Sequence, residues 1–273
     1  MIIGGNKAVL FATTTGSRAS TCFHHRRIGH RRSKPENSGA SPNAGSDSIY
    51  DPEREAQHGI QLHGPERVLI RHVTITDVYG DSVYVGRDLR KKRPTWTVPS
   101  RDVTMVDNVF PRNGRQGIAI SQGSRLLIAR NDISEVRRTT FDLEPNGPSW
   151  LVEDVSIEHN RVGAGRLNFL LAAGRGPVNR IRVAYNKLTG KVMNAMIVDH
   201  NGESRRNWSF IGIESNRKFG SPLIGAFVGY GVQGIVFRDN VMASEQRRRA
   251  AGSGHAAEAA HLTNPPHGGL PPA

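Results

Sequence analysis

Apolar and polar positions alternate in a recurring arrangement between residues 66 and 242. In each copy, two aliphatic or aromatic residues precede an Asn by five and three positions, and a third usually follows it by two. VTMVDN, which ends at Asn108, is one such copy. The other copies end at Asn131, Asn160, Asn186, Asn216 and Asn240, and an earlier copy has Val73 in place of the Asn. Period-two alternation before a fixed polar residue predicts a half-buried strand that ends in a tight turn.

A second pair of apolar residues stands ten and twelve positions after each of these anchors. The pairs are Val83 and Val85, Ile118 and Ile120, Phe141 and Leu143, Leu170 and Ala172, Met196 and Val198, and Ala226 and Val228. Gly59, Ile60 and Leu62 match the same strand one copy earlier. Coils stacked at about 4.8 Å would bury both strands, and the Asn amides would bond from coil to coil. The sequence therefore predicts an all-β, single-domain parallel β-solenoid of about seven to eight coils.

The solenoid is expected to occupy residues 49–242. Residues 1–48 are predicted to be irregular and largely disordered, with one degenerate coil at IIGGNKAVLFATT, and residues 243–273 a disordered tail without an apolar period. No stretch reaches the ~18 apolar residues of a membrane span, and the opening residues do not predict a signal peptide.

Composition supports a turn-rich β architecture, because the chain has 30 Gly and 15 Pro but only 6% aromatic residues. The single cysteine, Cys22, excludes an internal disulfide. Its spacing to His24, His25 and His30 matches no standard zinc site, so neither a metal nor another cofactor is expected.

The formal net charge is +13, and residues 24–32 read HHRRIGHRR. No aromatic residues are interleaved with these arginines, so the stretch is interpreted as a solvated basic tail rather than a nucleic-acid site. No nucleic-acid or membrane partner is expected, and the chain is predicted to be a monomer.

The anchor VTMVDN with the strand GIAI (residues 117–120) resembles the right-handed parallel β-helix repeats of the pectate-lyase-like superfamily. The stretches AQHGIQL, DVYGDSVYVG, FDLEP and VGAGR are similar to bacterial β-helix proteins of unassigned activity. The resemblance implies a right-handed coil, an extracellular location and a substrate groove along the second strand; a chain complete as given would be cytoplasmic. This fold carries lyases, hydrolases, epimerases and non-catalytic fibres, so it does not define one activity.

Asp142 and Glu144 are predicted to point outward from one second strand, with Cα atoms about 6.5 to 7 Å apart. Paired carboxylates at about 6.5 to 9.5 Å suit inverting hydrolysis of a glycoside. Glu144 with Asp199, two coils away and roughly 9.6 Å apart, is an alternative pair. A calcium site of Asp81, Asp142 and Asp199 is set aside, because these residues lie coils apart.

The arginines of the loop before this strand suggest a lyase instead. Arg115, Arg138 and Arg166 could neutralise a uronate carboxylate while Tyr84 or His63 removes the neighbouring proton. The predicted substrate-binding residues are Arg115, Gln116, Arg137, Arg138, Arg166, Asp81, His58 and Asp199.

The sequence thus predicts a carbohydrate-active protein that engages an acidic polysaccharide, with β-elimination ranked ahead of hydrolysis. Two alternatives stay open. The solenoid could be a non-catalytic binding or surface-display protein, and Asp142 and Glu144 could be a solvated strand face paired with Arg137 and Arg138.

Overall fold

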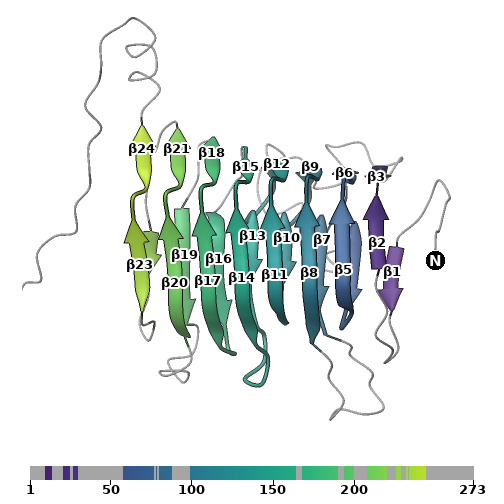
Figure 1. The fold of residues 1–273 in the computed structure, drawn as a ribbon, viewed down its shortest axis with the longest axis horizontal. Helices are drawn as coiled ribbons and strands as arrows, with labels where there is room; N and C mark the ends of the chain where they lie inside the picture. Colours follow the sequence, from purple (N-terminus) through teal and green to yellow (C-terminus); the bar gives the residue numbers. More distant parts are fainter. Residues whose placement is uncertain are drawn as a thin grey trace, which may run out of the picture.

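The computed structural model describes residues 10–13, 21–24, 27–29, 58–76, 78, 80–87, 99–163, 168–189, 194–199, 208–219, 226–228, 232 and 234–243. This part of the chain is built of strands that repeat in threes and contains no helix. Figure 1 shows the strands side by side along the long axis of the molecule, from purple β1 to yellow-green β24.

The described strands form three parallel sheets of eight strands each, and every coil gives one strand to each sheet. Sheet A contains β1 (Leu10–Thr13), β4 (Ile60–His63), β7 (Val83–Gly86), β10 (Ile118–Ile120), β13 (Phe141–Leu143), β16 (Asn168–Gly174), β19 (Asn194–Asp199) and β22 (Ala226–Val228). Sheet B contains β2 (Thr21–His24), β5 (Glu66–Arg71), β8 (Ser100–Val106), β11 (Gly123–Ala129), β14 (Val152–Glu158), β17 (Val178–Ala184), β20 (Trp208–Glu214) and β23 (Ile235–Arg238). Sheet C contains β3 (Arg27–Gly29), β6 (Thr74–Thr76), β9 (Val109–Asn113), β12 (Asp132–Val136), β15 (Arg161–Val162), β18 (Lys187–Thr189), β21 (Arg217–Phe219) and β24 (Val241–Ala243). The predicted fold class, a parallel β-helix, is confirmed.

The core runs through the middle of the coils and consists of the anchor residues read from the sequence. Val103 of β8 is opposite Leu126 of β11, which is opposite Val155 of β14, and all three are buried. In sheet A, Ile118 and Phe141 are register partners and are buried in the same way. Equal positions of successive coils therefore stack, and each apolar side chain is covered above and below.

The predicted asparagine column is a continuous hydrogen-bonded ladder. Oδ1 of Asn131 accepts the backbone N–H and the side-chain Nδ2–H of Asn108, at 3.0 and 2.8 Å, while its own Nδ2 donates to the carbonyl of Met105 at 3.0 Å. The same bonds recur from coil to coil up to Asn240. At the N-terminal end of the ladder, the backbone N–H of Val73 donates to Asn108 Oδ1. Val73 has no side-chain amide, so the ladder ends at this copy.

The residue before each ladder position has a left-handed backbone. The φ angles lie between 53° and 57° for His72, Asp107, Arg130, His159, Tyr185, Ser215 and Asp239. A bulky residue seldom adopts this conformation. Its recurrence at one position shows that the tight turn between sheets B and C fixes the backbone there, whatever side chain is present.

Strands β1 and β3 of the first coil lie in the N-terminal residues 1–48. Strand β1 lies within IIGGNKAVLFATT, the stretch expected to be a degenerate coil, and it pairs with β4. Strand β3 lies within residues 24–32, and its Ile28 is the register partner of Ile75 of β6 in sheet C. The tail beyond Ala243 lies outside the described residues.

Candidate functional site

The outward residues of β7, β10 and β13 form the candidate site on sheet A. Tyr84, Ala119, Asp142 and Leu171 occupy one register column on four successive strands. Ser121 and Glu144 follow two residues after Ala119 and Asp142 on their strands, on the same side by alternation. Stacking of coils thus brings together side chains that are far apart in the sequence, as predicted.

Asp142 is buried to an extent that the sequence did not predict. Its side chain is 1% exposed, and among the described residues its Oδ1 atom has no hydrogen-bond partner. Burial raises the pKa of the Asp142 carboxyl well above its usual range, and the nearby carboxylates of Glu144 and Asp81 raise it further. The cations Arg115 and Arg138 act on this pKa in the opposite direction without reversing it. The result is a carboxyl that favours its protonated form.

Glu144 lies one residue beyond β13, and its side chain is half-buried. Its backbone N–H donates to the carbonyl of Ile120 at 2.9 Å, which extends the pairing of β10 and β13 by one residue. The site therefore holds two carboxyls in different environments, one buried and one half-buried, at positions i and i+2 of one strand.

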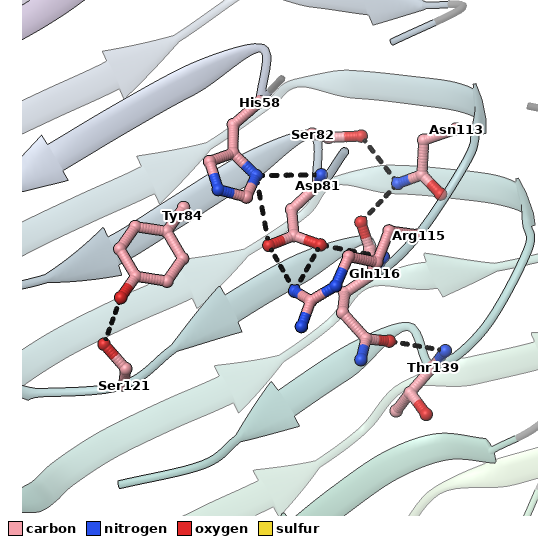
Figure 2. Close-up of polar contacts among 9 residues, drawn as sticks. All are labelled: His58, Asp81, Ser82, Tyr84, Asn113, Arg115, Gln116, Ser121 and Thr139. Atoms are coloured by element: carbon pink, nitrogen blue, oxygen red, sulfur yellow. Dashed lines mark hydrogen bonds and ion pairs between the residues drawn. The ribbon is translucent and has the colours of Figure 1, made fainter. Parts of the chain in front are cut away.

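Tyr84 connects the site to two histidines. Its hydroxyl lies 2.6 Å from Oγ of Ser121, and its ring stacks on His58 with centroids 4.9 Å apart (Figure 2). His63 lies tilted against the same ring at 6.0 Å, and its Nδ1 is 3.0 Å from the carbonyl oxygen of Arg87. Burial raises the pKa of the Tyr84 hydroxyl, so Tyr84 retains its proton.

His58, Asp81 and Gln116 form a second polar ladder, which sequence reasoning missed. The backbone N–H of Asp81 donates to Nδ1 of His58 at 3.0 Å, that of Gln116 to Oδ1 of Asp81 at 2.9 Å, and that of Thr139 to Oε1 of Gln116 at 2.8 Å (Figure 2). The side chains of these three residues and of Thr139 are buried. The signal was present, because Asp81, Gln116 and Thr139 stand eight positions after the anchors Val73, Asn108 and Asn131.

The ladder assigns a structural role to residues predicted to contact substrate. In each step, the side chain of one coil accepts the backbone N–H of the next, as in the asparagine ladder but in the opposite chain direction. Nδ1 of His58 also lies 3.2 Å from Oδ2 of Asp81, but it cannot donate to this oxygen while it accepts the Asp81 N–H. His58, Asp81 and Gln116 therefore support the backbone beneath the site, and they do not form its exposed surface.

Arg115 bridges the ladder and the site. Its Nη1 atom lies 3.1 and 3.0 Å from the two carboxylate oxygens of Asp81, which is fully buried. Arg138 is half-buried, and its backbone N–H donates to the carbonyl of Arg115 at 2.9 Å. Arg137 is among the largest fully buried side chains, so it does not belong to a solvated strand face. Arg166 lies outside the described residues.

Asp199 is not in the column predicted for it. The expected inward pair of its strand was Met196 and Val198, but the register places Leu170 opposite Ala195 and Ala172 opposite Ile197. A bulge between Asn168 and Leu170 causes this shift of one residue in the Cα register. Asp199 is therefore the Cα partner of Gly174 and not of Ala173, one residue out of the register on which the pair of Glu144 and Asp199 was predicted.

Within the described residues, no three His, Cys, Asp or Glu side chains gather in a way that could hold a metal ion. A search of the same residues for a long apolar helix that could cross a membrane finds none.

The family model described as "Right handed beta helix region" matches residues 48–209, more than half of the chain, so the protein belongs to this family. The predicted right-handed β-helix repeat is thereby confirmed. A SPbeta prophage-derived uncharacterized protein, YorA of Bacillus subtilis (strain 168), is 30% identical over 98 residues. These residues are 34% of this chain and 17% of that protein, so the chain covers much less than two thirds of its relative. No solved structure matches.

Proposed function

We propose that this β-helix binds an acidic polysaccharide on the outer face of sheet A and hydrolyses it, with Asp142 as the general acid. The observation that carries the proposal is the environment of Asp142, a buried carboxyl with an unpartnered oxygen and a raised pKa. A general acid at neutral pH must keep its proton until the glycosidic oxygen takes it.

Glu144 is the matching general base. Two residues along a strand place the Cα atoms of Asp142 and Glu144 about 6.6 Å apart, so rotation of the side chains can bring their carboxyl groups to the separation of about 6.5 to 9.5 Å that inverting glycosidases use. Asp142 would give its proton to the leaving oxygen as the glycosidic bond breaks. Glu144 would take a proton from the water that attacks the anomeric carbon, and exchange with solvent would then restore both carboxyls.

Two features favour hydrolysis over the β-elimination that the sequence suggested. The raised pKa of Tyr84 makes its hydroxyl a weak candidate for a base. Arg115, expected to clamp a uronate, is held by Asp81. The paired carboxyls are thus better placed for chemistry than the lyase residues.

An acidic sugar suits the electrostatics of this face. Arg138 is half-buried and close enough to Asp142 to influence its pKa, so it could bind a substrate carboxylate beside the acid. The positive net charge of +13 would attract a polyanion from a distance.

A non-catalytic binding solenoid is the second candidate. Ala119 and Ser121, the neighbours of the carboxyl pair on β10, are also buried, which favours a closed face and a structural role for Asp142. The two candidate functions differ in whether a substrate can reach Asp142.

The test is the incubation of the full chain and of Asp142→Asn and Glu144→Gln variants with a panel of uronate-containing and neutral polysaccharides. Hydrolysis by the wild-type protein releases reducing ends without new ultraviolet absorbance, and each variant lowers kcat by at least about 100-fold. Asp102→Asn, which removes an exposed carboxylate paired with Arg125, is the matched control and retains activity. Unsaturated products would indicate elimination, and binding without turnover would leave the non-catalytic solenoid.

A further inference from the structure

We propose that Asp81 is a positioning residue that holds the Arg115 guanidinium away from Asp142 and so keeps Asp142 a proton donor. This inference rests on the proposed function, since it concerns the same acid, but its first test needs no substrate.

The contacts of Asp81 show how firmly it is held. Its Oδ1 atom accepts the backbone N–H of Gln116 at 2.9 Å, and its own backbone N–H donates to His58 at 3.0 Å. Both bonds belong to the second polar ladder and fix the carboxylate relative to two neighbouring coils. Both carboxylate oxygens then bind the same atom, Nη1 of Arg115, at 3.1 and 3.0 Å. A fixed, fully buried carboxylate is a strong anchor for a cation.

Arg115 is the cation that could otherwise neutralise Asp142. Among the charged groups that act on the Asp142 carboxyl, Glu144 and Asp81 raise its pKa, whereas Arg115 and Arg138 lower it. These groups come from the strand of Asp142 and from the segments before β7, β10 and β13, while the register partner on β16 is the apolar Leu171. An Arg115 side chain that turned from Asp81 to the unpartnered oxygen of Asp142 would form a salt bridge and ionise the acid.

Replacement of Asp81 tests this arrangement directly. In Asp81→Asn, the amide oxygen can still accept the Gln116 N–H, so the ladder keeps its bond while the anchor for Arg115 loses its charge. We expect Asp142 to titrate at lower pH in this variant than in the wild type. The measurement is a carbon-13 NMR titration of the aspartate carboxyls in the full chain, with the Asp142 signal assigned by its loss in Asp142→Asn.

The double variant Asp81→Asn/Arg115→Gln, compared with Arg115→Gln alone, separates movement of Arg115 from the loss of a nearby negative charge. In the Arg115→Gln background, Asp81→Asn removes a charge and nothing else, so it should lower the Asp142 titration by less than it does in the wild type. Equal shifts in the two backgrounds would overturn the proposal. So would an Asp81→Asn variant with a native circular dichroism spectrum and a wild-type Asp142 titration.

Two further experiments apply if Asp81→Asn does not fold or if a cleaved glycan is found. If Asp81→Asn does not fold, Asp81→Ser, whose hydroxyl can also accept the Gln116 N–H, replaces it in both variants. If a cleaved glycan is found, the alkaline limb of kcat/KM against pH moves to lower pH in Asp81→Asn, with about a tenfold loss or more at neutral pH. If no glycan is cleaved, the proposed function fails, while the NMR titration still decides the role of Asp81.

Discussion

Asp142 is an unusual residue for the outer face of a solenoid strand. An unpartnered carboxyl oxygen in a 1% exposed side chain costs stability, because burial removes hydration without a replacement hydrogen bond. The ordinary solution for such a position is an apolar side chain, and the register neighbours Ala119 and Leu171 are apolar. A carboxyl retained at this cost is consistent with a functional role.

Asp142→Asn is expected to make unfolding less sensitive to pH. The folded-state pKa of Asp142 is raised above the unfolded value of about 3.9, so the wild type loses stability as pH rises from that value through the folded pKa. Asn cannot ionise, so the variant gains about 1 to 3 kcal/mol over the wild type at pH 7, and the gain vanishes below about pH 4. Urea unfolding at several pH values measures this difference.

Asp154→Asn is the control with the opposite sign. Its hydrogen bond with Arg180 lowers the pKa of Asp154, so the contribution of Asp154 is present above the unfolded pKa and fades as pH falls. This pair is exposed, so the effect is small. Equal pH profiles for Asp142→Asn and the wild type would mean that Asp142 is ionised in the folded protein.

At the scale of elements, each coil is joined to the next by two ladders as well as by its core. Asn131 takes part in the bonds that satisfy Asn108, Met105 and Asn160, whereas Asn240 lies at the half-exposed end of the described ladder. An amide in the middle of the ladder thus stabilises two interfaces, and a terminal amide stabilises one.

Asn131→Ala is therefore expected to destabilise the protein more than Asn240→Ala. Loss of the central amide leaves buried groups of Asn108 and Met105 without their partners and costs about 3 kcal/mol. The same change at Asn240 exposes the freed groups to water and costs about 1 kcal/mol. Thermal unfolding of both variants measures the difference, and equal costs would contradict an additive, coil-by-coil ladder.

Much of this element structure could be predicted from the sequence. The alternation around Asn108 and Asn131 defined both the inward columns and the ladder, because a stacked coil must repeat its buried positions. The register of Asp199 could not be predicted, since the bulge after Asn168 adds a residue without a change in the apolar pattern. The burial of Asp142 was also missed, because alternation tells which side a residue faces but not what covers that side.

At the scale of the molecule, the net charge of +13 and the local cations of the site would make different contributions to the proposed binding of a polyanion. Long-range attraction depends on total charge and is screened within about 10 Å at 0.1 M salt. A contact between Arg138 and a substrate carboxylate depends on position and is screened less, because Arg138 is half-buried. Two variants with the same net charge can therefore separate the two contributions.

Arg138→Gln and Arg161→Gln each lower the net charge by one, but Arg161 is an exposed residue of sheet C, 3.8 Å from Asp132. At low salt, both variants are expected to lose the same small long-range contribution to their affinity for a uronate polymer, and Arg138→Gln additionally loses its contact with the substrate carboxylate. At 0.3 M salt, Arg138→Gln should bind about tenfold more weakly than Arg161→Gln, a difference of about 1.4 kcal/mol that is typical of one charged hydrogen bond. Fluorescence anisotropy with a labelled oligouronate measures both series. Identical curves at every salt concentration would assign polyanion binding to net charge alone and remove Arg138 from the site.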